Sequence, residues 1–297
     1  MVDAMRIRTI GFLGFVAATA GCSSDRAYAP PGTVLTDAQV SSDIAATAGM
    51  AAATSLAEQT DFLGGAGVSP SMNTFGPLIP TGQTQPVPGA STAPAPAAAR
   101  PACTYTAKTG AWNCASFVNA HGQTVTMSYA YMDASGGAMQ QYSATLTERI
   151  IYNSQLDGPV GDGATLTGTT HRKQQQILSG LSGKEVTRIW NGSGVSSDTT
   201  DYHTPSVSRH YVGAEVDSLK NVVYPQPRTA GSYPLSGEIV RVANYTATAV
   251  GKTTESRSVS RTVLTTFNGT ANVTVKTGHV TCTLHLDTRK VDGCVSG

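Results

Sequence analysis

The segment QTVTMSYAYMDA, residues 123–134, alternates apolar and polar side chains at almost every step. Val125, Met127, Tyr129 and Tyr131 fall on one side of this alternation, and small or hydroxylated residues fall on the other. A period of two residues is the pattern of a strand with one buried and one wet face. The sequence therefore predicts a strand here, with an apolar row that faces a core.

The same period continues through the rest of the chain. After the turn SGG, Leu146, Ile150 and Tyr152 are expected to share one face of the next strand, with Thr147 and Arg149 on the other. Further alternating stretches are EIVRVANYTATAV, SRSVSRTVLTTF, ANVTVKT and HVTCTLHLDT, and turn signals rich in Gly, Pro and Asn separate them. The prediction is an all-β fold: a long antiparallel meander of about ten to thirteen strands, as a curved sheet, a sandwich or an open barrel, with one N-terminal helix.

Charge is sparse along the chain. The 297 residues carry a net charge of +1, and charged side chains make up 13% of them, against about 25% in typical soluble proteins. This composition gives no support for a nucleic-acid partner or a polybasic membrane surface. A hydrophobic share of 40% is enough for a core, and the chain length allows one or two domains.

The first residues have the layout of a secretory signal. Arg6 and Arg8 precede a short apolar run that ends in small residues, and this run is too short to cross a bilayer. It leads into TAGC, residues 19–22, which resembles the lipobox of bacterial lipoproteins. The resemblance implies that residues 1–21 are a signal peptide and that Cys22 is lipidated and becomes the mature N-terminus.

The lipoprotein resemblance also implies a location. Acyl chains on Cys22 would hold the protein stably at a membrane of the cell envelope. Ser23, rather than an aspartate, follows the cysteine, and by the same resemblance this favours the outer membrane, facing the periplasm or the cell surface. The alternatives are ordinary secretion, which would leave Cys22 trimmed away or free, and a buried N-terminal helix, which two glycines would weaken.

The residues after the cysteine change composition twice before the strands begin. Residues 22–34 are expected to form a tether, and residues 35–61 a helix that starts with a capping box. In that box, Thr36 is the N-cap and Gln39 its partner three positions later. The apolar stripe of this helix is thin, so two interpretations stay open: the helix docks on the sheet or on a partner, or it is a marginal helix within the tether.

The second change of composition is a linker. Residues 62–101 are rich in Pro, Ala and other small residues, a composition that favours an extended, semi-rigid spacer. The β domain is therefore expected at residues 102–297, held off the membrane surface. Because few contacts should cross such a linker, the β domain is also expected to fold without the residues before it.

Four cysteines follow the one in the lipobox, and disulfides are the default for them in an exported protein. One pair, Cys103 and Cys114, bounds CTYTAKTGAWNC, and the other, Cys282 and Cys294, bounds CTLHLDTRKVDGC. In each stretch a strand, a polar turn and a returning strand lie between the cysteines, so the spacing predicts one disulfide across each hairpin. A bridge from the first hairpin to the last is the chief rival. A four-thiolate zinc site is a remoter one, because the spacings lack a C-x-x-C knuckle.

The search for catalytic chemistry finds few candidates. The chain has no G-x-S-x-G, H-E-x-x-H, P-loop or dinucleotide-binding fingerprint. The densest titratable cluster holds Asp198, Asp201, His203 and His210, in which Asp201 and His203 share a strand face. Such a set could bind a divalent metal, but it is also typical of a solvated edge hairpin, which is the preferred interpretation. No catalytic residue, metal or cofactor is predicted.

Three functions are compatible with these features of the sequence. The leading hypothesis is a membrane-anchored lipoprotein of the cell envelope with a non-enzymatic structural or binding β domain. The alternative is a carrier for lipid or another apolar ligand, which would resemble the periplasmic lipoprotein-sorting proteins in having a curved sheet plugged by helices. A metal-dependent hydrolase is the remote third. The expected partners are the membrane, through the lipid anchor, and an apolar ligand or an envelope protein. An open apolar cavity would favour the carrier, and a filled core the structural role.

Overall fold

The computed structural model describes residues 35–63, 102–119, 121–143, 145–181, 185–204, 207–226, 232–251 and 253–297. These ranges contain one helix, α1 (Asp37–Leu63), and fourteen strands. The strands are β1 (Cys103–Thr106), β2 (Ala111–Cys114), β3 (Phe117–Val118), β4 (Thr124–Asp133), β5 (Ala138–Met139), β6 (Thr147–Gly161), β7 (Leu166–Ser179), β8 (Thr187–His203), β9 (Ser208–Pro225), β10 (Ser236–Val250), β11 (Thr254–Thr266), β12 (Asn272–Thr277), β13 (Val280–His285) and β14 (Lys290–Ser296).

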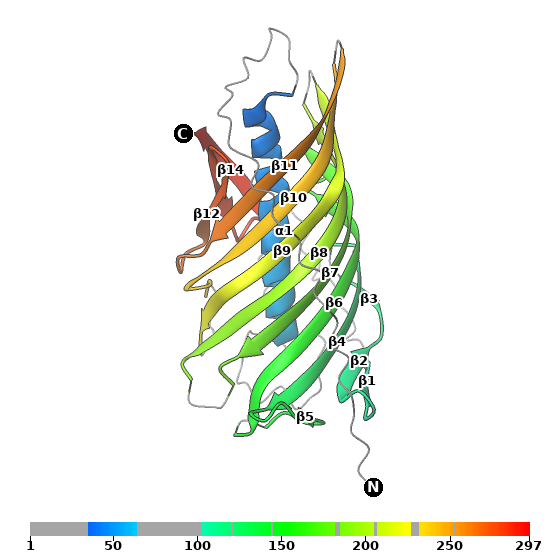
Figure 1. The fold of residues 1–297 in the computed structure, drawn as a ribbon, viewed down its shortest axis with the longest axis vertical. Coiled ribbons are helices and arrows are strands. Elements are labelled where there is room, and N and C mark those ends of the chain that lie inside the picture. The colour runs from blue at the N-terminus through cyan, green and yellow to red at the C-terminus, as the bar shows by residue number, and fades with distance from the viewer. Residues whose placement is uncertain are drawn as a thin grey trace, which may run out of the picture. The chain divides into compact units, whose positions relative to one another are not determined.

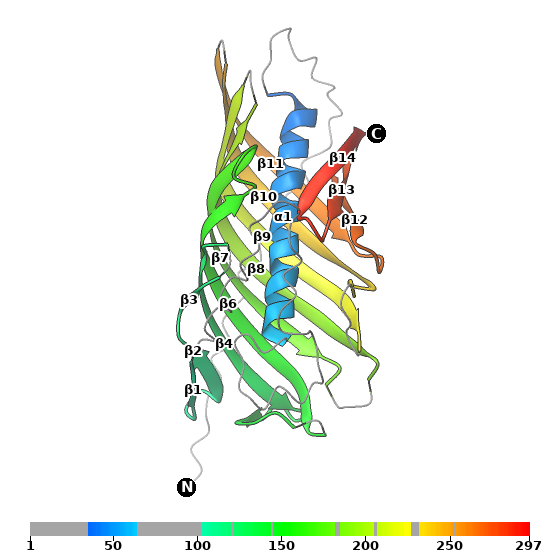
Figure 2. The same ribbon diagram turned by 180° about the vertical axis from the view of Figure 1, so that it is seen from behind.

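All described strands belong to one antiparallel sheet. The main path runs β1-β2-β4-β6-β7 and then in sequence order to β14, while β3 and β5 pair with β4. Neighbours in the sheet are thus mostly neighbours in the sequence, as in a meander. The sheet curls around α1 (Figure 1, Figure 2), but it does not close into a barrel. The all-β prediction is confirmed, in the form of one curved sheet with an N-terminal helix.

Alternation in β4 turns its apolar row inward, as predicted. Val125, Met127, Tyr129 and Tyr131 are buried, whereas Thr124 on the opposite face is exposed. Tyr129 and Tyr131 pack edge to face, with ring centroids 5.5 Å apart, a favoured arrangement of aromatic pairs. Met127, Tyr129 and Tyr131 belong to the main core.

The prediction for the start of β6 is wrong at two residues. Leu146 is 62% exposed and Thr147 is fully buried, the reverse of the expected faces. The pairing of β4 with β6 shifts register at this point, so that β6 accommodates an extra residue before Ile150. Such an irregularity exchanges the two faces of the strand beyond it. Ile150 and Tyr152 are buried on the predicted face.

Helix α1 begins with the predicted capping box. The backbone N–H of Gln39 donates to Oγ1 of Thr36, and the backbone N–H of Thr36 donates to Oε1 of Gln39, both at 3.2 Å. Leu35 and Val40, on either side of this box, are both buried and can form the hydrophobic staple that fixes the entry of the chain.

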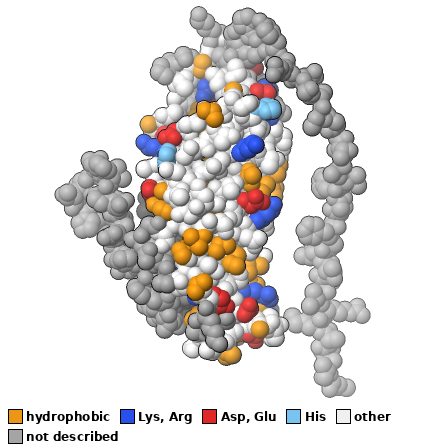
Figure 3. Space-filling view, turned by 90° about the vertical axis from the view of Figure 1, so that its left-hand side faces the viewer, with side chains coloured by type: hydrophobic (Ala, Val, Ile, Leu, Met, Phe, Trp, Pro, Cys, Tyr) orange, Lys and Arg blue, Asp and Glu red, His pale blue; other side chains and the backbone are white. Residues whose placement is uncertain are grey.

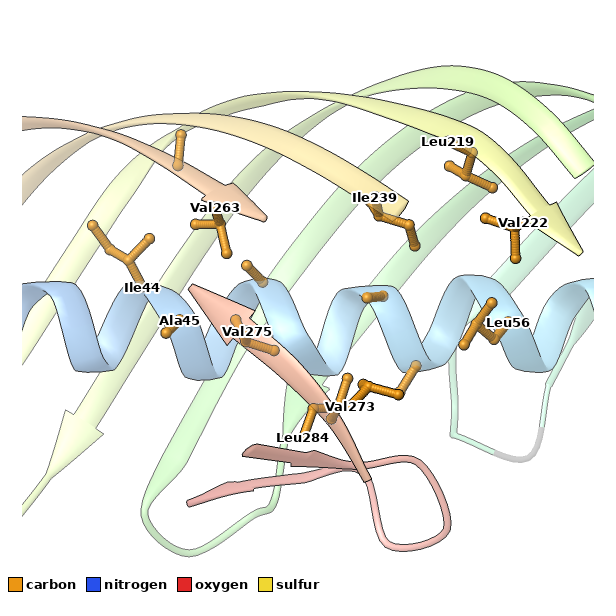
Figure 4. Close-up of a cluster of buried hydrophobic side chains, with 14 of the residues drawn as sticks. Ile44, Ala45, Leu56, Leu219, Val222, Ile239, Val263, Val273, Val275 and Leu284 are labelled. Carbon is orange, nitrogen blue, oxygen red and sulfur yellow. The ribbon is translucent and has the colours of Figure 1, made fainter. Parts of the chain in front are cut away.

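Helix α1 packs in the concave face of the sheet. Its closest approaches are to β10–β14, and Figure 4 shows the apolar side chains that meet there. They are Ile44, Ala45 and Leu56 of α1, Leu219 and Val222 of β9, Ile239 of β10, Val263 of β11, Val273 and Val275 of β12, and Leu284 of β13. The helix therefore lies inside the main hydrophobic core, with strands on two sides of it.

This packing decides between the two interpretations of the helix. The helix docks on the sheet instead of standing apart in the tether. Removing α1 would expose the core side chains that cover it, so we expect the strands alone to be less stable than the full chain.

The two disulfides of the structure join Cys103 to Cys114 and Cys282 to Cys294, which are the pairs that the spacing predicts. Cys103 and Cys114 are direct partners across the β1–β2 pair. The second disulfide links β13 to the edge strand β14. Each bridge closes a short loop, which contributes about 2–3 kcal/mol in the chain-entropy model.

Charged side chains are sparse on one face of the molecule. Figure 3 shows a face dominated by uncharged side chains and backbone, with single charged groups scattered over it.

Candidate ligand-binding cavity

The concave face of the sheet is only partly apolar. On β7–β10 it carries buried polar and charged side chains among the apolar ones. They include Arg172, Gln174 and Gln176 on β7, Arg188, Asp198 and Thr200 on β8, Arg209, Glu215 and Asp217 on β9, and Arg241 on β10. Strand alternation places them there, since each lies an even number of residues from a buried neighbour such as Leu178 or Tyr211. Buried charges need ionic and hydrogen-bonding partners, and most of these partners fall into three groups.

The first group ties the N-terminal half of α1 to β8 and β9. Arg209 donates to both carboxylate oxygens of Asp43, from Nε at 2.6 Å and from Nη2 at 3.0 Å. The hydroxyl of Tyr211 donates to Oδ2 of Asp43 at 2.6 Å. The hydroxyl of Tyr202 donates to the backbone carbonyl of Asp43 at 2.5 Å. The hydrogen bond with Asp43 raises the pKa of Arg209, against the opposing effect of burial. This group is fully paired and acts as a structural anchor.

The second group ties the C-terminal half of α1 to β7. Arg172 donates from Nη2 to Oε1 of Glu58 at 2.9 Å and from Nη1 to the carbonyl of Ala51 at 3.1 Å. Gln174 donates to the other oxygen of Glu58. Gln59 donates to the side-chain carbonyl of Gln176 at 3.0 Å. Long polar side chains thus bridge the helix to β7, a strand outside its closest approaches.

The third group has more negative than positive charge. Oε2 of Glu215 lies 3.1 Å from Nε of Arg241, and Oδ2 of Asp217 lies 3.7 Å from Nη2 of the same arginine. The hydroxyl of Tyr245 donates to Oε1 of Glu215 at 2.8 Å. Burial raises the pKa of the Glu215 carboxyl; the charge of Arg241 opposes this rise, and the charges of Asp198 and Asp217 add to it. Three carboxyl groups therefore share one guanidinium.

A cavity of about 700 Å³ lies beside the third group, between α1, the β6–β7 hairpin and the β13–β14 turn. Its walls include Met50, Leu156 and Leu166 on the apolar side and Arg172, Asp198 and Glu215 on the charged side. Exposed His121 and Lys290 also line it, so the cavity reaches solvent. Its volume falls within the range of about 300–1,000 Å³ that is typical of small-molecule sites.

A second hollow, of about 640 Å³, lies on the convex face of the sheet. The side chains that stand around it include Lys173, Val195 and Val216, and both valines are 53% exposed. It is a shallow depression among surface side chains and lacks the buried charged wall of the first cavity. We therefore take the cavity beside α1 as the candidate site.

The four titratable residues singled out in the sequence do not form one cluster, because Asp198 lies apart from the other three. Asp198 is buried on the concave face of β8, whereas Asp201 and His203 lie on its opposite face. Asp201 pairs with His210 of β9, with Nδ1 and Oδ1 2.7 Å apart, and His203 lies 3.3 Å from the hydroxyl of Ser208. In the described part of the chain no three His, Cys, Asp or Glu residues are placed to hold a metal ion.

Other candidates fall outside the described residues or escape sequence reasoning. Cys22 is one of the former. The pairing of Asp43 with Arg209 is one of the latter, because the two residues lie far apart in the chain. The signal that could have indicated it is parity: Arg209 lies two residues from Tyr211 and hence on the same strand face.

Comparisons with family models, with curated proteins and with solved structures found no match for this chain. In its described residues, the structure defines an all-β fold in which one open antiparallel sheet curls around one helix. Among the described residues, no helix combines the length and the apolar character needed to cross a membrane.

Proposed function

We propose that this protein is a lipid-anchored, non-enzymatic binding protein of the cell envelope, which holds a small amphipathic ligand in the cavity between α1 and the sheet. The cavity is the observation that carries the proposal. Unfilled space and buried charge both cost stability, and a purely structural domain gains nothing from either. A ligand-binding site accounts for both.

The composition of the wall favours an amphipathic ligand over a wholly apolar one. Met50, Leu156 and Leu166 offer apolar surface, but Arg172, Asp198 and Glu215 stand in the same cavity. A hydrocarbon placed against these charges would remove their remaining water without replacing its hydrogen bonds. A lipid carrier with an apolar concave face is therefore the less supported of the two binding functions.

Filling the cavity provides the test of binding. Ala46 lines the cavity from α1, and Ala214 is exposed on the convex face of β9. We expect native mass spectrometry of the full chain, extracted from its own membranes, to show a bound small molecule in the wild type and in Ala214→Trp but not in Ala46→Trp. Thermal melts would verify that both variants fold. Equal occupancy in Ala46→Trp and the wild type would refute the cavity as the site.

The membrane anchor is supported by the basic and apolar signal and by TAGC at residues 19–22. We expect metabolic labelling with an alkyne analogue of palmitate to mark the wild type and to leave Cys22→Ala unlabelled, because a thioether-linked lipid requires the thiol. Labelling of Cys22→Ala equal to that of the wild type would remove the anchor from the proposal.

A further inference from the structure

We propose that the ligand of this cavity carries a protonated amine, held by the carboxylate of Asp198, next to an apolar body that lies along Met50 and Leu156. This inference rests on the proposed binding function and specifies its ligand class. It starts from Asp198, because Glu215 and Asp217 each lie within 4 Å of Arg241, whereas Asp198 interacts with the charge of this arginine without forming such a close ion pair.

Asp198 is buried without a cation of its own. Its side chain is on the wall of the cavity and the residue is only 7% exposed. One carboxylate oxygen accepts a hydrogen bond from the hydroxyl of Ser196 at 2.7 Å. Its other oxygen has no hydrogen-bond partner, and its carboxylate no ion pair, in the part of the chain that the structure describes. A carboxylate oxygen on a cavity wall that has no partner from the chain can accept a charge-assisted hydrogen bond from a cationic ligand.

The charges around Asp198 favour a cation from outside the chain. Arg241 already faces both Glu215 and Asp217, and Arg172 pairs with Glu58 of α1. With one guanidinium for three carboxyl groups, the third group has room for one or two further positive charges. The raised pKa of Glu215 agrees with such a surplus.

The remaining walls set what accompanies the amine. Met50 and Leu156 are apolar, and the cavity volume of about 700 Å³ leaves space for a hydrocarbon or ring body beyond the charged end. The phosphate of a phosphatidylethanolamine headgroup would bring a negative charge toward Asp198 and Glu215. The same electrostatics therefore favours an amine without an adjacent anion.

The experiment compares three probes of equal chain length: octylamine, octan-1-ol and octanoate. The full chain in dodecyl maltoside is placed on one side of an equilibrium dialysis membrane, with empty micelles at the same concentration on the other, so that partition into micelles cancels. The variants are Asp198→Asn and the matched control Asp201→Asn, a residue on the opposite face of the same strand.

The wild type is expected to bind octylamine at least ~10-fold more tightly than octan-1-ol, with octanoate the weakest, because only the amine replaces a missing charge-assisted hydrogen bond. Asp198→Asn should lose most of this preference, and Asp201→Asn should keep it. Because the three probes are also compared on the wild type alone, the test remains valid even if a variant fails to fold. If octan-1-ol binds as tightly as octylamine, the amine class is wrong while the binding function stands. If no probe binds and native mass spectrometry finds no ligand either, both proposals fail.

Discussion

Asp37 and Asp43 lie on the same helix but in opposite environments. Asp37 is exposed beside Arg257 and Arg261, while Asp43 is buried and receives hydrogen bonds from Arg209 and Tyr211. Asp43→Asn would leave the guanidinium of Arg209 buried without its counter-charge, so we expect it to reduce the free energy of unfolding by about 3–5 kcal/mol. Asp37→Asn should change it by less than about 1 kcal/mol. Urea unfolding measures both, and equal effects would show that the Asp43 pair is solvated.

Glu215 provides a prediction about pH. Its pKa is raised in the folded protein, chiefly by burial, so between the ordinary and the raised value the folded state keeps a proton that the unfolded chain has released. The free energy of unfolding must therefore fall as pH rises through this window. Urea unfolding of Glu215→Gln between about pH 5 and pH 8 should show a smaller fall than the wild type. Glu238→Gln is the control, because Glu238 pairs with Lys220 at the surface, and its free energy of unfolding should depend on pH as in the wild type. If Glu215→Gln also showed the wild-type pH dependence, the raised pKa of Glu215 would be contradicted.

At the scale of the element, Gly49 of α1 faces Leu284 and Val291 of the β13–β14 hairpin. A Cβ at Gly49 would lie 2.5 Å from Cγ2 of Val291, and a valine side chain cannot easily rotate away. Alanine gains about 1 kcal/mol over glycine in a helix interior, but overpacking costs about 1–3 kcal/mol. We expect Gly49→Ala to destabilise the wild type and to stabilise Val291→Ala. Thermal unfolding of the four proteins in this double-mutant cycle tests the prediction. If Gly49→Ala changed the unfolding temperature in the same direction in the wild type and in Val291→Ala, the proposed contact would be refuted.

The elements that the sequence predicts well are those with local signals. The capping box of Thr36 and Gln39 and the alternating row from Val125 to Tyr131 each lie within one segment, and both are observed. The faces of Leu146 and Thr147 were mispredicted because a register shift depends on the partner strand. From the sequence alone, Gly49 is only a residue that weakens a helix. The structure shows that Val291, near the other end of the chain, leaves no room for a larger side chain there.

At the scale of the whole molecule, the site is harder to predict than the fold. Asp198 drew attention in the sequence because His203 and His210 are near it, yet alternation separates it from those histidines and places it beside Glu215, within reach of the cavity. The helix that completes the cavity is separated from the first strand by residues 64–101, which lie outside the described part of the chain, and composition alone does not reveal that this helix packs on the sheet. Only the tertiary arrangement brings α1, β7, β8 and β9 to one place.

The central claim is that α1 and the sheet form one core with the cavity between them. The most direct test is the thermal unfolding of the chain from Arg100 to Gly297, produced in an oxidising compartment and followed by circular dichroism, with and without a peptide of residues 35–63. Without the peptide, the exposed concave face should give aggregation or a broad transition, and adding the peptide should restore a cooperative one. A cooperative transition at the temperature of the full chain, unchanged by the peptide, would contradict the account.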